Sequence, residues 1–128
     1  MSYEIKTENA PAAIGPYVQG VDLGNIIITS GQIPVDPKTG EIAADIIAQT
    51  TQSLENIQAI VEKAGLNVAN IVKTTVFVKD LNDFASVNAT YEAFFNKHNA
   101  PYPARSCVEV ARLPKDVCIE IEAIAIRK

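Results

Sequence analysis

The chain is poor in the residues that commonly carry nucleophilic and metal chemistry. Its 128 residues include two cysteines, one histidine and no tryptophan. Cys107 and Cys118 are too few for a disulfide framework and lack the short spacing of a zinc-binding pair. His98 is the only histidine and is expected at the C-terminal end of a helix, so most nucleophile–histidine pairs are disfavoured. We therefore expect a protein that works without a metal ion, a cofactor or a catalytic histidine.

Long apolar runs and clusters of basic residues are also missing. No apolar run approaches the ~18 residues that a membrane span needs, and no basic segment followed by an apolar one begins the chain. We therefore expect a cytoplasmic protein without membrane contacts. The formal net charge is −4 at pH 7, and the basic residues are scattered along the chain. Because nucleic-acid binding relies on clustered Lys and Arg side chains, we expect no nucleic-acid partner.

Length and apolar periodicity predict a single α+β domain, residues 1–128, with a sizeable core. Apolar stripes at helical spacing predict helices over 45–64 and 84–98, the second capped by Asn82 or Asp83. The inner stripe of the second helix is expected to contain Phe84, Val87, Tyr91 and Phe94. Alternating or β-branched segments predict six strands. These strands are expected at 3–7, 17–22, 26–30, 71–79, 105–112 and 117–126. The order β-β-β-α-β-α-β-β is typical of two helices packed on one face of a sheet.

The last expected strand carries two kinds of side chain. Its odd positions are wholly apolar and should face the helices, whereas its even positions mix Glu120 and Glu122 with large apolar groups such as Ile124. Two helices cover only one face of a sheet, so a partner subunit over the other face would bury Ile124 and leave Glu120 in a partly buried cleft. Alternatively, the two carboxylates form a solvated pair opposite Lys73 and Lys79.

The segment that contains Arg105 also alternates its chemistry with the period of a strand. Arg105, Cys107 and Glu109 should project to one side. An arginine offers a planar fork of donors that matches a carboxylate through two parallel hydrogen bonds, so this side is a candidate site for a small anion. The alternative is an edge-strand arginine in a surface ion pair and a cysteine that acts as a small core residue.

Six segments in this order resemble the RidA family of reactive-intermediate deaminases. They are residues 15–17, 30–34, 73–78 with 80–81, 88–95, 103–110 and 119–123. The resemblance covers nearly the whole chain. It includes Arg105, which separates the deaminase branch of the family from relatives whose activity is doubtful.

The resemblance implies a chorismate-mutase-like fold, in which a six-stranded mixed sheet carries two helices on one face. It also implies a homotrimer with clefts between subunits, and a last strand that inserts into the middle of the sheet. Proteins that the chain resembles hydrolyse 2-aminoacrylate, 2-aminocrotonate and their imines to 2-oxo acids and ammonia. The resemblance therefore implies small 2-imino and 2-oxo acids as ligands, and a role in metabolite damage control and isoleucine biosynthesis.

The resemblance also assigns roles to residues. Arg105 would bind the substrate carboxylate and Glu120 would orient the attacking water and relay its proton. The residues expected to bind the substrate are Tyr17, Ser30, Gly31, Asn88, Arg105 and Cys107. Asn88 would come from the adjacent subunit. Two other functions stay open at this stage: an endoribonuclease or translation inhibitor, and a non-enzymatic 2-oxo-acid binder or holdase.

Overall fold

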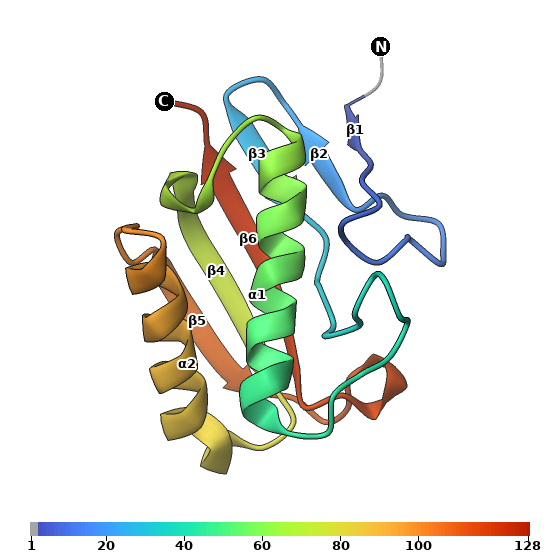
Figure 1. Ribbon diagram of the computed structural model, residues 1–128, viewed down its shortest axis with the longest axis vertical. Coiled ribbons are helices and arrows are strands. Elements are labelled where there is room, and N and C mark those ends of the chain that lie inside the picture. Colours follow the sequence, from blue (N-terminus) through green and yellow to red (C-terminus); the bar gives the residue numbers. More distant parts are fainter. Residues whose placement is uncertain (1–2) are drawn as a thin grey trace.

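The computed structural model describes residues 3–128, and within them a six-stranded sheet carries two long helices on one face (Figure 1). The strands are β1 (Glu4–Ile5), β2 (Gly20–Asp22), β3 (Ile26–Thr29), β4 (Ile71–Val78), β5 (Ala104–Glu109) and β6 (Ile119–Ile126). The helices are α1 (Ile46–Lys63) and α2 (Phe84–Lys97), with short 3₁₀ turns η1 (Val68–Asn70), η2 (Leu81–Asp83) and η3 (Pro114–Asp116). The predicted α+β class is confirmed.

The helices lie within one residue of their predicted limits, and Asp83 occupies one of the two predicted cap positions of α2 without the expected capping bond. The Asp45 carboxylate accepts a hydrogen bond from the Ala48 amide at 2.7 Å and begins α1. Asp83 stands at the N-cap of α2 without a side-chain cap hydrogen bond. Asp80 instead accepts from the Asn82 amide, because the chain makes the turn η2 before α2 begins.

The last strand lies in the middle of the sheet. The strand order is β1-β2-β3-β6-β4-β5, with β6 antiparallel to both β3 and β4 and with β5 parallel to β4 at the sheet edge. The expected insertion of the last strand is therefore confirmed, and the sheet is mixed. Strand β5 is shorter than predicted because its pairing with β4 ends at Glu109.

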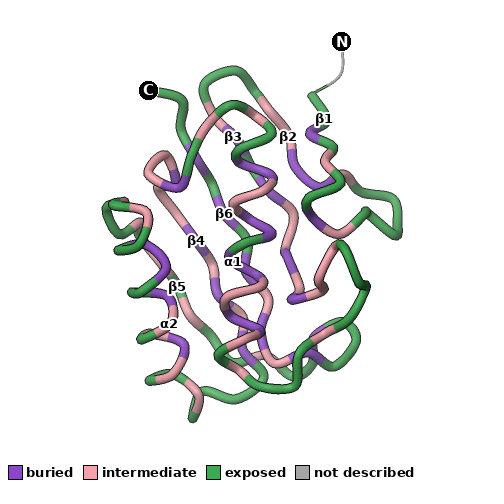
Figure 2. Tube along the Cα trace, in the orientation of Figure 1, coloured by how far each residue is buried: buried purple, intermediate pink, exposed green. Residues whose placement is uncertain are grey.

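The two faces of the sheet differ in burial, as the alternation in β6 predicts. The odd positions of β6 are buried under the helices, where the core is concentrated (Figure 2). On the opposite face, Ile28 is 40%, Val108 44% and Ile124 36% exposed. These three side chains form a partly exposed apolar surface on the face that carries no helix, called the open face below.

Candidate functional site

Arg105 lies on the helix side of the sheet edge, beneath α2. Its register partner on β4 is Thr74, which is fully buried. The guanidinium carbon lies 5.0 Å from the centre of the Tyr91 ring and 5.5 Å from the centre of the Phe84 ring. The guanidinium makes no hydrogen bond or ion pair with any residue from 3 to 128. A half-buried cation with unused donors is suited to an anionic ligand, and the alternative of a surface ion pair is not observed.

Cys107 lies near this guanidinium, and Asn88 lies on the stripe of α2 that carries the two rings in contact with it. Asn88 stands four residues after Phe84 and three before Tyr91, so the three side chains share one stripe of α2. Cys107 lies two residues after Arg105 on the same side of β5 and packs against the core. Burial raises the pKa of the Cys107 thiol, and the positive charge of Arg105 opposes this only in part. The thiol is therefore protonated at neutral pH, which disfavours a thiolate nucleophile.

Glu120 packs directly on the backbone of Gly31. A Cβ atom placed on Gly31 would lie 2.3 Å from Oε2 of Glu120, so this contact requires a glycine. The neighbouring residue, Gln32, holds the segment against β6 by exchanging two backbone hydrogen bonds with Ile121 at 2.7 and 3.1 Å. Burial raises the pKa of the Glu120 carboxyl, and the negative charge of Glu122 raises it further. A carboxylate of this kind is better suited to accept a proton than an ordinary one.

The alternative interpretation makes Glu120 and Glu122 a solvated pair opposite two lysines, Lys73 on β4 and Lys79 directly after it. Lys79 forms its ion pair with Asp116 at 3.1 Å, and Lys73 donates to the Ser106 hydroxyl at 3.0 Å. Neither lysine is paired with Glu120 or Glu122 in the described part of the chain. The Glu120 carboxylate is thus free to take a ligand or a water molecule.

Ser30 and Tyr17 flank the Gly31 segment. The Ser30 hydroxyl donates to the Val18 carbonyl oxygen at 2.6 Å, so its lone pairs remain available to accept a hydrogen bond from a ligand. Tyr17 is 49% exposed, and its hydroxyl accepts a weak bond from the Ile14 amide at 3.4 Å. Tyr17 and Gly31 share a cavity of about 240 Å³. These residues and Glu120 form one group of predicted site residues.

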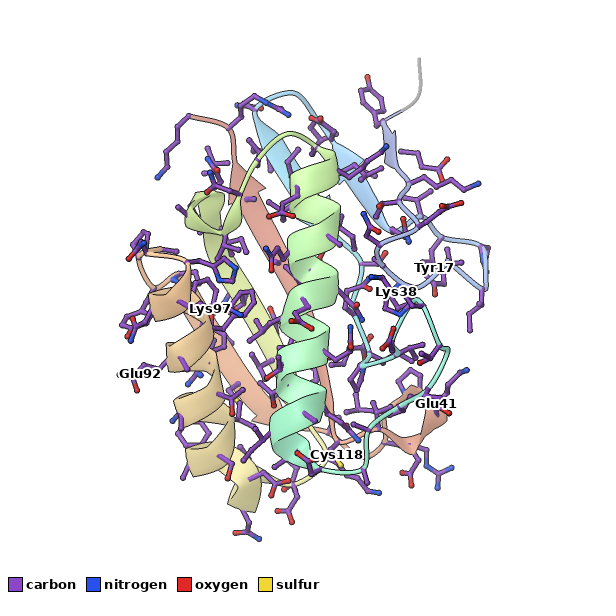
Figure 3. All side chains as sticks on the ribbon, viewed as in Figure 1. Tyr17, Lys38, Glu41, Glu92, Lys97 and Cys118 are labelled. Atoms are coloured by element: carbon purple, nitrogen blue, oxygen red, sulfur yellow. The ribbon has the colours of Figure 1, made fainter. Side chains whose placement is uncertain are left out.

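The structure brings the predicted site residues together in two groups and does not join the groups. Arg105 is in register with Thr74 on the helix side, whereas Glu120 is in register with Phe77 and, through it, with Val108 on the open face. The Arg105 and Glu120 backbones are three residues apart along the strands and two strands apart across the sheet, a separation of about 14 Å. Their side chains project from opposite faces of the sheet. Tyr17 also lies at the opposite lateral edge of the molecule from α2 (Figure 3).

Two aromatic contacts of the guanidinium are missing from the site predicted from sequence. Phe84 and Tyr91 are predicted for the inner stripe of α2, but Phe84 is 41% exposed and lies over Arg105 instead of in the core. The signal in the sequence is the spacing of Phe84, Asn88 and Tyr91, which places both rings on the same side as a predicted ligand-binding residue.

The described residues limit two other kinds of site. No group of three His, Cys, Asp or Glu side chains within residues 3–128 converges to hold a metal ion. In the same part of the chain, neither α1 nor α2 combines the length and the apolar character that crossing a membrane requires.

Comparisons with known proteins agree over nearly the whole chain. A family model described as endoribonuclease L-PSP matches residues 7–127. The 2-iminobutanoate/2-iminopropanoate deaminase of Escherichia coli (strain K12) is 80% identical over 128 residues, which cover 100% of both chains. The crystal structure of the YjgF gene product from E. coli has a TM-score of 0.98 at 79% identity, and covers 99% of this chain and 100% of the other.

A second solved structure contains a ligand. The crystal structure of E. coli TdcF with bound serine has a TM-score of 0.97 at 64% identity, and covers 98% of both chains. Serine is an amino acid of the size of a small 2-imino acid, and it carries the same carboxylate group. On the match to the family model and to these relatives, the chain belongs to the L-PSP family, and its resemblance to the RidA deaminases is confirmed.

Proposed function

We propose that this protein is a single-domain cytoplasmic enzyme that hydrolyses 2-iminopropanoate and 2-iminobutanoate to the 2-oxo acid and ammonia. The observation that carries the proposal is the half-buried Arg105 guanidinium, which has no hydrogen bond or ion pair with residues 3–128. Such a cation selects a small substrate that carries a carboxylate. The full-length relative named 2-iminobutanoate/2-iminopropanoate deaminase supports this substrate class.

Hydrolysis of the imine requires that the substrate and one water molecule be oriented and that protons be transferred. Water adds to the carbon of the C=N bond, and its proton passes to the nitrogen. The hydroxyl proton of the resulting tetrahedral adduct is then transferred to the nitrogen, and ammonia leaves as the C–N bond breaks and the C=O bond forms. No electron is gained or lost, and the imine carbon is already electrophilic. Positioning of the substrate and of one water molecule therefore accounts for most of the catalysis required.

Each residue of the two groups has a role in this reaction. Arg105 binds the carboxylate through two charge-assisted hydrogen bonds, each of which contributes about 1.5–3 kcal/mol. Glu120 orients the attacking water and accepts its proton, to which its raised pKa is suited. Tyr17 and Ser30 place hydroxyl groups near the imine nitrogen, and the Gly31 backbone lies close to the ligand.

The two groups meet only if a second copy of the chain supplies the missing half. Arg105 and Cys107 lie on β5 beneath α2, which carries Asn88, whereas Glu120 and Gly31 lie on the open face. An interface that joins one such region to a different region of the next copy is heterologous, and it closes into a ring of three when successive copies are related by a rotation of one third of a turn. We propose a homotrimer of the chorismate-mutase-like type, with a substrate cleft at each interface. The apolar open face supports this assembly.

The proposed activity is tested by supplying the imine as it forms. A pyridoxal-phosphate-dependent serine or threonine dehydratase generates the imine, and its decay is followed with and without this protein. Arg105→Ala should lower kcat/KM on the order of a hundredfold or more, because two charge-assisted hydrogen bonds are lost. Arg112→Ala, which changes an exposed arginine that follows β5, is the matched control and should keep full activity. Decay at the wild-type rate with Arg105→Ala would refute the role of Arg105.

The description of the family model names an endoribonuclease, and this activity gives a distinct signal. RNA cleavage should fall steeply as ionic strength rises, because contacts to phosphates release counterions. Imine hydrolysis at a single guanidinium should respond weakly over the same range. With a net charge of −4, we expect imine hydrolysis and no RNA cleavage by the purified protein. A ribonuclease assay at two salt concentrations, run beside the imine assay, decides between them.

A further inference from the structure

We propose that Phe84 and Tyr91 are positioning residues for Arg105: their rings hold the guanidinium in place while its N–H donors stay free for the substrate carboxylate. The inference rests on the proposed carboxylate-binding role of Arg105 and explains how a single unpaired arginine is kept ready for that role. The two rings come from α2 and the guanidinium from β5.

The rings contact the guanidinium from two turns of the same helix. The central carbon of the guanidinium lies 5.5 Å from the centre of the Phe84 ring and 5.0 Å from the centre of the Tyr91 ring. Both distances lie within the range of about 6 Å over which a cation is attracted to a ring. Phe84 and Tyr91 are seven residues apart, which places both on one side of the helix. Arg105 is thus bound to α2 at two points.

Tyr91 is itself fixed, and the residue that fixes it is the neighbour of Arg105. Its hydroxyl and the Thr74 hydroxyl are hydrogen-bonded at 2.6 Å, and both residues are buried. Thr74 is the register partner of Arg105 on β4. The Tyr91 ring also packs on Phe95, with ring centres 4.8 Å apart. Strand β5, strand β4 and helix α2 are therefore joined in a closed set of contacts around the guanidinium.

Holding an arginine by rings leaves its binding capacity intact. A carboxylate partner would occupy the in-plane N–H donors and neutralise the charge that attracts the substrate. A ring is attracted to the charge and takes up none of the donors. Burial raises the pKa of Tyr91, so its side chain stays a neutral phenol and adds no competing negative charge. The arrangement favours a guanidinium that is both ordered and available.

The expected effect of losing a ring is on binding more than on chemistry. A guanidinium that is free to rotate must be ordered each time the substrate binds, and this lowers affinity for substrate and transition state alike. Phe84→Leu should therefore raise KM by about threefold to tenfold, the range set by a cation–π contact, while kcat changes by less than about twofold. Phe84→Tyr restores a ring and should return KM to the wild-type value.

The matched control is Phe94→Leu. Phe94 is a ring of the same helix that is 5% exposed and packs on Phe95 and His98, without an aromatic contact to Arg105. This substitution disturbs the core more than Phe84→Leu does and should lower stability while leaving KM unchanged. Tyr91→Phe keeps the ring and removes the bond to Thr74, so it should give a smaller rise in KM than Phe84→Leu. The dissociation constant for pyruvate, a 2-oxo acid, should follow KM across these variants.

The outcomes separate this inference from the proposed function. If Arg105→Ala abolishes turnover but Phe84→Leu and Phe94→Leu share the wild-type KM, the positioning role is wrong and the proposed function stands. If Arg105→Ala turns over normally, the proposed carboxylate-binding role of Arg105 fails, and NMR still tests the contact between the guanidinium and the rings. The Arg105 Nε–H proton should lie upfield because of the ring currents, and should move downfield in Phe84→Leu but not in Phe94→Leu. An unmoved resonance would overturn the inference.

Discussion

At the scale of single residues, the Gly31 backbone determines where the Glu120 carboxylate can lie. In Gly31→Ala the new methyl group would meet Oε2 of Glu120 at 2.3 Å, and the end of a flexible side chain can move away from it. The fold should therefore persist while the carboxylate is displaced, with kcat reduced by about tenfold to a hundredfold. Steady-state kinetics and thermal unfolding of the same sample check both parts.

Gly20→Ala is the contrasting substitution. A Cβ at Gly20 would meet Cγ2 of Ile60 at 2.9 Å and the Ile28 carbonyl oxygen at 3.1 Å, in the packed core. Overpacking of this kind lowers stability by about 1–3 kcal/mol and should leave kcat of the folded enzyme unchanged. Equal kcat values for Gly31→Ala and the wild type would contradict the proposed contact with Glu120.

The Glu120 carboxyl should titrate above the ordinary range of a glutamate. Burial raises its pKa first and the charge of Glu122 second, so Glu122→Gln should lower the pKa of Glu120. Titration followed through the carboxyl carbon resonance by NMR measures this directly. In the pH profile of kcat/KM, the rise on the acid side should move to lower pH in the same variant, because it reports the pKa of Glu120. If the acid side of the profile is the same in Glu122→Gln and in the wild type, a group other than Glu120 determines it.

The same pKa has a consequence for stability. Because the folded state raises the pKa of Glu120, the residue stabilises the protein below the unfolded-state pKa, and this contribution is lost as pH rises through the folded-state pKa. Glu120→Gln should therefore lower activity and increase resistance to urea at neutral pH.

At the scale of elements, the two helices begin in different ways, and this difference can be measured. The Asp45 carboxylate accepts from the Ala48 amide at 2.7 Å, whereas Asp83 makes no cap hydrogen bond. Asp45→Ala should lower the free energy of unfolding by about 1 kcal/mol. Asp83→Ala should lower it by only about 0.3 kcal/mol, because no capping hydrogen bond is lost. Urea denaturation of both variants is the measurement. Equal losses would contradict the assigned caps.

The elements also show what local sequence patterns predict. The apolar stripe of α1 and the alternation in β6 depend on neighbours in the chain, so their positions are predicted closely. The central place of β6 depends on pairing with β3 and β4, which local patterns do not encode, and was expected from the family resemblance. The end of β5 was overestimated because the Val110 amide donates to the Val78 carbonyl oxygen at the last residue of β4, and the chain after Val110 has no strand to pair with there.

The site was predicted less completely than the fold. Arg105 and Glu120 carry distinctive chemistry in strand-like segments, so both are recognised from sequence. Phe84 was predicted on the inner stripe of α2 but is 41% exposed, whereas Tyr91 is buried as predicted. The contacts of both rings with Arg105 were missed because an apolar stripe does not distinguish a ring packed in the core from a ring packed on a cation.

At the scale of the whole molecule, the open face should be covered by other copies of the chain. Ile124 is 36% exposed there and lies opposite Ile28 and Lys73. Ile124→Glu places a charge in the proposed interface, so it should give single chains without imine hydrolysis, because the two halves of each site separate. Ile47→Glu, at a 55% exposed isoleucine of α1, is the control and should keep the wild-type mass. Analytical ultracentrifugation checks both, and a wild-type mass for Ile124→Glu would count against this interface.

In the proposed assembly, Arg105 of one copy and Glu120 of the next complete the same site. Arg105→Ala and Glu120→Gln chains, each inactive alone, can be co-expressed with different affinity tags and purified through both tags. Every mixed ring of three then contains one interface with both native residues, so activity should return to about one third of the wild-type value. Mixed assemblies no more active than either parent variant would contradict the claim.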